Sequence, residues 1–319
     1  MVNDALAESP RVVILMATYN GARFIREQLE SIVRQSHVNW VLLVHDDGST
    51  DDTVAIVDDF ARTEPRIVRL SDEHTGLGAA GNFLWLLDRA PLDADFYACC
   101  DQDDVWLEQK LERLLDCLKS EEGPALVYSN GWTLRHGEVT DEPVLTFLPE
   151  DLAAVLFLNG GVHGCLMLFN QPLLCLVRNF SGFMVMHDHL LVLAAATFGR
   201  LVHKRDKLVH YRKHEDNVTF GYETNFWRKL RGFFDLGRPV VNRRHLKATL
   251  DFFDRFRDSM TADRRREFEA FERYCGGAGR TERLALVLRY GFGLGQSRAA
   301  LLLKTMLRPA VGEFAVRGA

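Results

Sequence analysis

The 319-residue sequence has no apolar run near the length of about 20 residues that crossing a bilayer requires. Residues 1–10 also lack the basic-then-apolar order of a secretory signal peptide, so we expect a cytoplasmic protein. The six cysteines show none of the paired spacings of a metal site. We therefore predict that they are reduced and mostly buried thiols.

Glycine is scarce at the place where a nicotinamide cofactor would need it. The first predicted strand, residues 11–17, is followed by the turn Thr18-Tyr19-Asn20-Gly21, which holds one glycine. The dinucleotide fingerprint G-x-G-x-x-G places a glycine-rich turn there. The sequence therefore argues against nicotinamide chemistry.

The composition that is present, 47% hydrophobic and 26% charged, is ordinary for a soluble enzyme. The charge is divided unevenly along the chain. Residues 1–220 carry 19 Lys+Arg against 33 Asp+Glu, while residues 221–319 carry 20 against 11, giving net charges of −14 and +9. A basic, Leu-rich tail can meet an anionic membrane, or it can pack on the acidic part. Nucleic acid is not an expected partner.

Apolar strands alternate with amphipathic helices over the first half of the chain. This alternation predicts an α/β fold with a mainly parallel sheet flanked by helices. We divide the chain into a catalytic domain at residues 1–220 and a basic helical C-terminal region at residues 221–319. The predicted strands of the first half are residues 11–17, 40–44, 67–70, 97–100 and 125–128.

Three acids follow the fourth predicted strand within four positions: Asp101, Asp103 and Asp104. Parallel sheets bind ligands at the carboxyl ends of their strands. Carboxylates there repel one another unless a cation lies among them, and their oxygens suit Mg²⁺ or Mn²⁺ bridging to a phosphate. In the alternative interpretation, Asp103 or Asp104 caps a helix predicted over residues 107–119.

Two later segments carry candidate chemistry. Asp188 lies between two histidines where a helix is predicted to begin, which suits either a general base or an N-cap. Residues 208–214 read as a last strand, whose alternation puts Arg212 and His214 on one face. Such a pair suits a diphosphate or its metal, and a solvated edge strand is the alternative.

The motifs at residues 18–20, 46–51 and 101–103, in this order after three strands, resemble those of family 2 glycosyltransferases with a GT-A fold. The resemblance extends over about residues 11–220. Within the family the pattern is most similar to bacterial rhamnosyltransferases that build O-antigen and other surface polysaccharides. Further matching positions are Gly78, Asn82-Phe83, Gly164-Cys165, His187-Asp188, residues 211–214 and Asn217.

The resemblance implies roles for these residues. Asp188 matches the catalytic base, although His187 stands where the family commonly has Glu. Asp103 is implied as a ligand of Mg²⁺ or Mn²⁺, and we add His214 to this metal site. The residues predicted to bind the nucleotide sugar are Thr18, Tyr19, Asn20, Asp46, Asp47, Asn82, Asp101, Gln102 and Arg212.

The implied reaction is inverting transfer of a sugar, with rhamnose as the expected one, from a nucleotide-diphosphate donor. The expected donor is dTDP-rhamnose or a UDP-sugar, and the acceptor a glycan or a polyprenyl-diphosphate-linked glycan. Contact of the basic tail with the inner face of the cell membrane would accompany such an acceptor. The alternatives are a nucleotidyltransferase that makes the sugar nucleotide and a non-catalytic protein that binds it.

Overall fold

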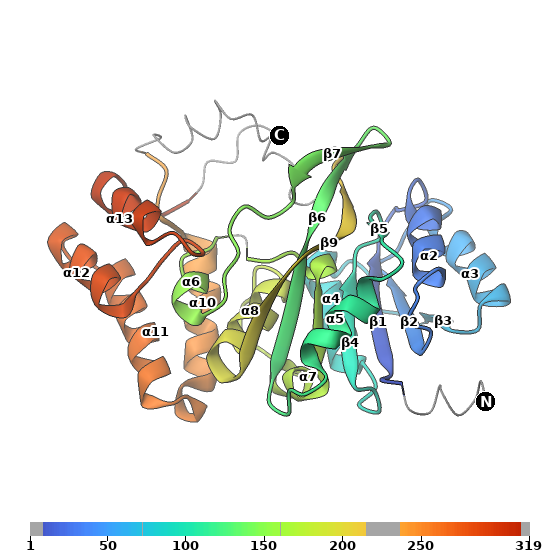
Figure 1. The fold of residues 1–319 in the computed structure, drawn as a ribbon, viewed down its shortest axis with the longest axis horizontal. Coiled ribbons are helices and arrows are strands. Elements are labelled where there is room, and N and C mark those ends of the chain that lie inside the picture. The colour runs from blue at the N-terminus through green and yellow to red at the C-terminus, as the bar shows by residue number, and fades with distance from the viewer. Residues whose placement is uncertain (1–8, 72, 160, 215–236, 314–319) are drawn as a thin grey trace.

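The structure, a computed structural model, describes residues 9–71, 73–159, 161–214 and 237–313. Within these ranges a nine-stranded sheet is flanked by helices (Figure 1). The strand order is β3-β2-β1-β4-β8-β6-β9-β5, and β7 pairs with β6 outside this path. The strands are β1 (Val12–Thr18), β2 (Trp40–Asp46), β3 (Ile67–Leu70), β4 (Phe96–Cys100), β5 (Val105–Trp106), β6 (Ala125–Arg135), β7 (Glu138–Pro143), β8 (Met167–Asn170) and β9 (Arg200–Arg212).

The first four strands are parallel, and β1, β2 and β4 are runs of mostly buried apolar residues. Such runs suit strands that helices cover on both faces. α2 (Ile25–Val33) and α3 (Thr53–Thr63) lead from β1 to β2 and on to β3, and α4 (Gly78–Arg89) returns to β4 beyond β1. Parallel crossovers are right-handed, so this reversal puts α4 on the opposite face. Sheets of this kind bind ligands where the strand order reverses, here between β1 and β4.

The second half of the sheet is mixed. β8 is antiparallel to its neighbours β4 and β6, whereas β6 and β9 are parallel to each other. A mixed, mainly parallel sheet flanked by helices confirms the predicted fold class. The helices of this half are α5 (Lys110–Leu118), α6 (Leu152–Val155), α7 (Gln171–Val177) and α8 (His187–Phe198), with a 3-10 turn at Gly164–Leu166.

Two predicted elements differ from the structure. The helix expected from residue 107 begins at Lys110, because β5 forms first and pairs with β9. Asp103 and Asp104 both precede β5, and Gln109 is the N-cap residue of α5, so the capping interpretation is wrong. β9 has 13 residues and lies between β6 and β5, so the solvated edge strand is wrong as well.

Residues 237–313 contain α10 (Arg243–Phe256), α11 (Ala262–Cys275), α12 (Arg280–Tyr290) and α13 (Arg298–Leu307), with the short pair β10 (Val241–Asn242) and β11 (Val311–Gly312). Aromatic side chains join them to the sheet domain. The ring of Phe157 lies 5.1 Å from that of Phe271 and 4.9 Å from that of Tyr274. The predicted boundary between residues 220 and 221 lies outside the described residues.

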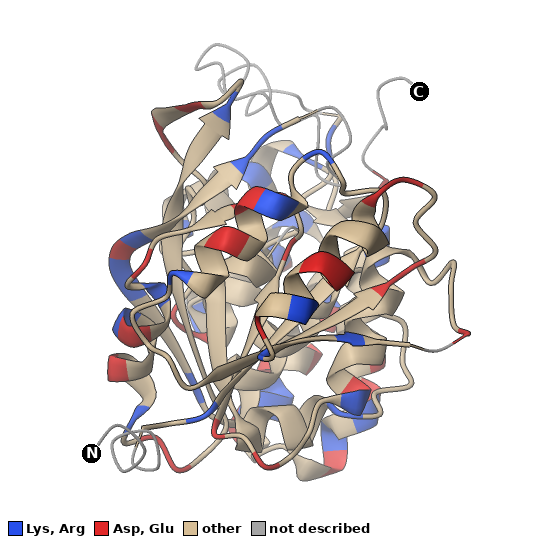
Figure 2. Cartoon of the chain, turned by 90° about the vertical axis from the view of Figure 1, so that its right-hand side faces the viewer, with Lys and Arg blue, Asp and Glu red and all other residues tan. Residues whose placement is uncertain are grey.

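Among the described residues, none of the helices has both the length and the apolar character that crossing a membrane requires. Figure 2 views the side of the molecule that carries α2 and α3, where acidic and basic residues are interspersed. Ion pairs such as Arg66–Glu64 and Arg69–Asp58 join charges in this part of the chain. The acidic excess of residues 1–220 is therefore not gathered into one patch on this side.

Candidate active site

Three predicted motifs meet at one edge of the sheet. β1 ends at Thr18, β2 ends at Asp46, and β4 ends directly before Asp101. In the register of the sheet Thr18 lies opposite Asp46, and Met16 lies opposite Cys100. The motifs therefore lie side by side at the carboxyl ends of adjacent strands, on both sides of the reversal in strand order.

The carboxylate of Asp46 is held within its own turn. Oδ1 accepts the backbone N–H groups of Gly48 at 3.1 Å and Ser49 at 2.7 Å. Oδ2 accepts the hydroxyls of Thr18 at 2.8 Å and Ser49 at 2.6 Å. These hydrogen bonds use both oxygens, so Asp46 and Thr18 fix the shape of the turn after β2.

Asp47 and Asn20 tie this turn to its neighbours. The carboxylate of Asp47 accepts the backbone N–H groups of Leu77 at 2.7 Å and Gly78 at 2.8 Å, at the start of α4. Oδ1 of Asn20 accepts the backbone N–H of Thr50 at 2.9 Å. Asn20 has φ 47, a left-handed conformation that Asn adopts more readily than most residues. The loops after β1, β2 and β3 are thus joined by side chains from two of the predicted motifs.

Tyr19 and Asn82 differ in their exposure. The side chain of Tyr19 is 57% exposed on the turn after β1, where a ligand can meet its ring. Asn82 is buried, and its amide bonds both the ring Nδ1 of His45 at 2.7 Å and the carbonyl oxygen of His45 at 3.2 Å. Asn82 therefore holds the end of β2 from inside the protein.

Gln102 joins the turn after β4 to the turn after β1. Its Nε2 donates to the carbonyl oxygen of Tyr19 at 2.9 Å, and its Oε1 accepts the backbone N–H of Tyr19 at 2.9 Å. A Cβ atom added at Gly21 would lie 2.3 Å from Oε1 of Gln102. The single glycine of the first turn is therefore needed for this close approach.

The acids after β4 carry unfavourable charge. Burial and the charge of Asp103 raise the pKa of Asp101 to about 7. Burial, followed by the charges of Asp103 and Asp101, raises the pKa of Asp104 well above its usual range. Ligand atoms of Asp101, Asp104 and Cys165 all lie within 4.8 Å of one another. A cation bound among these groups would relieve the repulsion.

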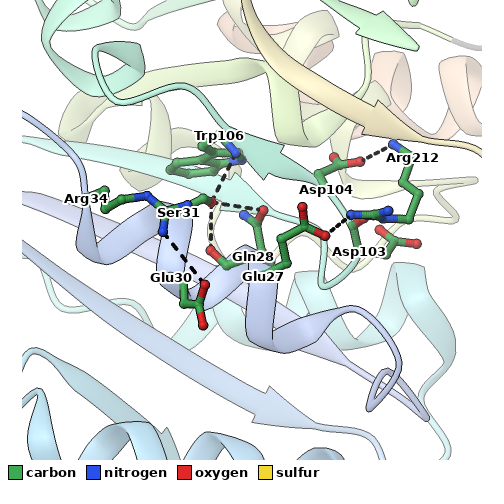
Figure 3. A network of polar contacts seen from close by, with 9 residues as sticks. All are labelled: Glu27, Gln28, Glu30, Ser31, Arg34, Asp103, Asp104, Trp106 and Arg212. Carbon is green, nitrogen blue, oxygen red and sulfur yellow. Dashed lines mark hydrogen bonds and ion pairs between the residues drawn. The ribbon is translucent and has the colours of Figure 1, made fainter. Parts of the chain in front are cut away.

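β9 brings two basic residues to the same turn. Nε2 of His214 lies 2.7 Å from Oδ2 of Asp103. The guanidinium of Arg212 donates through Nε to the carbonyl oxygen of Asp103 at 2.8 Å, and its backbone N–H donates to Asp104 at 3.0 Å. Figure 3 shows that Arg212 also pairs with Glu27 of α2. Arg212 thus connects α2, β9 and the acidic turn.

Asp188 lies in the first turn of α8 and is buried. The N-cap residue of α8 is Met186, so the capping interpretation of Asp188 is wrong. Burial raises the pKa of Asp188 to about 7, although hydrogen bonding to the backbone of His189 and Gly164 acts in the opposite direction. The charge of Asp101 raises the pKa of Asp188 further.

His187 occupies the position where the family commonly has Glu. Its ring stacks on Phe83 with centroids 3.8 Å apart, and burial lowers its pKa to about 3, so the ring is neutral. A Cβ atom at Gly164 would lie 2.3 Å from Nε2 of His187. The glycine therefore makes room for the imidazole beside Asp188.

The groups after β4 and β9 fit a hard divalent cation. Carboxylate oxygens are the preferred ligands of Mg²⁺ and Mn²⁺, and imidazole is a suitable further ligand for Mn²⁺. Asp103 and His214 already approach each other, and Asp101 lies beside them in charge contact. Burial raises the pKa of the Cys165 thiol well above its usual range, so this sulfur is neutral and a poor ligand. The oxygen donors are therefore the ones suited to the ion.

Neither Cys165 nor Glu27 was predicted to have a role in the site, and Asp104 was predicted only as one of three acids suited to a cation or as a helix cap. Asp104 was visible as the third acid of its motif, and the sequence resemblance included Cys165. Glu27 carried no signal, because its partner Arg212 lies 185 positions further along the chain. These three residues shape the acidic turn and its surroundings.

This strand order, with carboxylates at the reversal and a further buried carboxyl in the first turn of α8, is that of a GT-A type fold. Residues 13–150 match the family described as Glycosyl transferase family 2. Residues 13–150 therefore form a domain similar to those of the family 2 glycosyltransferases.

Three similar proteins illustrate the range of the family. The dTDP-rhamnosyl transferase RfbG of Shigella flexneri is 40% identical over 105 residues, which cover 32% of this chain and 36% of the relative. The GalNAc(5)-diNAcBac-PP-undecaprenol beta-1,3-glucosyltransferase of Campylobacter jejuni is 25% identical over 76% of this chain and 78% of its own. The mannosyltransferase PcManGT of Pyrobaculum calidifontis, solved with GDP-Man and Mn²⁺, shares the fold at TM-score 0.52 and 17% identity, covering 94% of this chain and 87% of that one.

The matches cover only part of several relatives. The chain spans 36% of the length of the Shigella flexneri enzyme and 60% of a Bacillus subtilis teichuronic acid glycosyltransferase, TuaG. These proteins thus have the fold and the family domain in common with this chain. The substrate named for each relative is a property of that relative.

Proposed function

We propose that the protein is an inverting, metal-dependent glycosyltransferase that moves a sugar from a nucleotide-diphosphate donor to a polysaccharide acceptor. The observation that carries this proposal is the buried carboxyl of Asp188, whose pKa is raised by burial and by the charge of Asp101 at the acidic turn. A base on one side of the site and a diphosphate-binding turn on the other are what a single displacement at the anomeric carbon requires.

Asp188 is the proposed general base. A carboxyl with a pKa near 7 accepts a proton from a sugar hydroxyl more effectively than an ordinary, more acidic carboxyl does. The deprotonated oxygen of the acceptor then attacks the anomeric carbon from the face opposite the nucleoside diphosphate. His187 supports this role as a neutral, packed ring, because a charged neighbour would lower the basicity of Asp188.

The donor site is proposed at the loops after β1, β2 and β4. The exposed ring of Tyr19 offers a face on which a nucleobase can stack. Asp101 is proposed to bind the ribose. The remaining predicted residues act through the loops they hold: Thr18, Asn20, Asp46, Asp47, Asn82 and Gln102.

Asp103 and His214 are the proposed ligands of Mg²⁺ or Mn²⁺. When bound, such an ion supplies positive charge that stabilises the departing diphosphate. Arg212 donates hydrogen bonds to the backbone carbonyl of Asp103 and to the carboxylate of Asp104, so it orients Asp103 as a metal ligand. The charge of Arg212 would lie beside the proposed diphosphate site. The Mn²⁺ complex of the structural neighbour supports this assignment.

Rhamnose is the proposed sugar and a polyprenyl-diphosphate-linked glycan the proposed acceptor. The name of the Shigella flexneri relative supports the first, and that of the Campylobacter jejuni relative supports the second. An acceptor of this kind would bring the enzyme to the inner face of the cell membrane as a peripheral protein.

A donor screen by product mass tests the proposal. The protein is incubated with dTDP-rhamnose, UDP-sugars and GDP-sugars together with a lipid-diphosphate oligosaccharide. We expect a glycan enlarged by one sugar, together with free nucleoside diphosphate, from one donor class. Release of pyrophosphate from a sugar phosphate and a nucleoside triphosphate would instead identify a nucleotidyltransferase. Binding of a donor without turnover of any acceptor would identify a binding protein.

A further inference from the structure

Large apolar side chains are exposed on α12 and α13, the last two helices of the described residues. Leu288 of α12 is 59% exposed, and on α13 Leu303 is 37%, Met306 is 50% and Leu307 is 38% exposed. The two helices pack against each other and lie at the edge of the molecule remote from β3 (Figure 1). We call these four side chains the α12–α13 surface.

The outer side of α13 lacks the polar face of an ordinary surface helix. Leu301 and Thr305 are buried and mark the inner side of the helix. Ala299, Leu303 and Met306 are exposed and follow one another at spacings of four and three, so they form a stripe on the outer side. A helix that is covered only on its inner side normally carries polar residues outside. The outer stripe of α13 is therefore suited to an apolar environment.

The segment between Glu282 and Glu313, which contains most of α12 and all of α13, carries charge of one sign. Between residues 283 and 312 the sequence holds five basic residues and no acid. Of the five, Arg289 and Arg298 are exposed, while Arg308 is buried. The acid nearest to this segment on α12, Glu282, is paired with Arg273 at 2.7 Å. Exposed leucines flanked by arginines are complementary to a surface with an apolar interior beneath an anionic outer layer.

We propose that the α12–α13 surface docks on an anionic lipid bilayer, with the leucines and Met306 in the interface and the arginines at the headgroups. A second copy of the chain fits less well, because two such surfaces face to face would bring basic residues together without an acid between them. The inference deepens the proposed function, since a lipid-linked acceptor would be met at the bilayer, but vesicle binding tests it without catalysis.

The test is co-sedimentation of the full chain with vesicles. One set contains phosphatidylglycerol and phosphatidylcholine in equal parts, and the other contains phosphatidylcholine alone. We expect binding to the anionic vesicles at low salt and release at high salt, because screening weakens attraction between surface charges. Absence of binding to anionic vesicles at low salt would overturn the proposal.

Variants separate this surface from the rest of the protein. The double variant Leu303→Glu with Met306→Glu should weaken binding to anionic vesicles by roughly tenfold or more, because it removes apolar burial and adds charge repulsion. The matched control is Leu92→Glu with Val139→Glu, which replaces apolar side chains that are 44% and 48% exposed elsewhere. Equal loss in both double variants, or no loss in the first, would contradict the assignment of the surface.

Two further readouts make the outcome decisive. Thermal unfolding of each variant shows whether the fold persists, and light scattering shows the oligomeric state. A dimer that Leu303→Glu with Met306→Glu converts to a monomer would identify a self-association surface and overturn the proposal. Donor turnover with a water-soluble acceptor should be the same in the variant and the wild type. A variant that loses vesicle binding but keeps full turnover would therefore test the α12–α13 surface alone. Wild-type protein that binds vesicles without any turnover would contradict the proposed function and leave the surface proposal intact.

Discussion

Replacing Asp188 by Asn should make the protein more stable at alkaline pH while removing transfer. Burial raises the pKa of Asp188 to about 7 in the folded protein, from an ordinary value of 3.8. Folding therefore favours the protonated carboxyl. The contribution of this group to stability is complete below the unfolded pKa, decreases as pH rises, and reaches its lowest level above pH 7. Asn cannot ionise, so the variant does not show this decrease.

The magnitude follows from the separation of the two pKa values. Each unit of difference between the two pKa values corresponds to about 1.4 kcal/mol of stability. Because pH 5 lies above the unfolded pKa, part of this stability is already lost from the wild type at that pH. Between pH 5 and pH 8 the free energy of unfolding of the variant should rise by about 2–3 kcal/mol relative to wild type. Relief of the repulsion between Asp188 and Asp101 is included in this difference.

The assay is urea unfolding followed by the fluorescence of the five tryptophans, at both pH values and with EDTA present. The matched control is Asp141→Asn, which replaces an exposed carboxyl on β7 and should shift the midpoint equally at both pH values. If the free energies of unfolding of Asp188→Asn and wild type change with pH in the same way, the conclusion that Asp188 is a buried carboxyl with a raised pKa is refuted. Transfer by Asp188→Asn should fall at least ~100-fold, and a smaller loss would assign the base to another residue.

Three further predictions concern the turns around the site. Asp103→Asn should lower turnover at least ~100-fold with an unchanged circular dichroism spectrum, and wild-type activity in EDTA would remove the metal from the mechanism. Gly21→Ala should raise the donor KM, because the added Cβ atom would displace Gln102. The control Gly123→Ala, whose added Cβ atom meets nothing within 4 Å, should leave the donor KM unchanged, and equal KM values for the two variants would contradict the contact between Gly21 and Gln102. Arg212→Lys should weaken Mn²⁺ activation roughly tenfold, because Lys lacks the planar fork that holds Asp103, and an unchanged Mn²⁺ titration would show that its charge alone matters.

The first half of the fold was predictable because its signals are local. β1, β2 and β4 are continuous apolar runs, and α2 has a regular apolar stripe, so period alone identifies them. β9 was predicted only from residue 208, although it begins at Arg200. Its first half contains Lys204, Arg205 and Asp206, so this part of the sequence lacks the apolar pattern that predicts a strand. Pairing with β6 stabilises the strand there. Propensity in strands depends on such neighbours, which a single sequence does not display.

The candidate site was predictable in position more than in detail. Strand ends located the acids, because parallel strands align their carboxyl ends. The hydrogen-bond partners could not be read from the sequence. Asn82 matched a motif of the family, yet its amide is committed to His45, and the carboxylate of Asp46 is used by its own turn. Such contacts depend on loop geometry, which no residue pattern specifies.

The contacts of Arg212 suggest why the acidic turn needs the last strand of the sheet. Burial and the charge of Asp103 raise the pKa values of Asp101 and Asp104, so the turn that carries these acids is unfavourable by itself. Arg212 and His214 come from more than one hundred positions later and bring donors to the backbone and carboxylate of Asp103. The contacts that hold the turn thus depend on the position of β9, which pairs with β5 and β6. We therefore expect formation of the proposed metal site to depend on β9, and substitutions that weaken β9 should reduce Mn²⁺ affinity before they unfold β1 to β4.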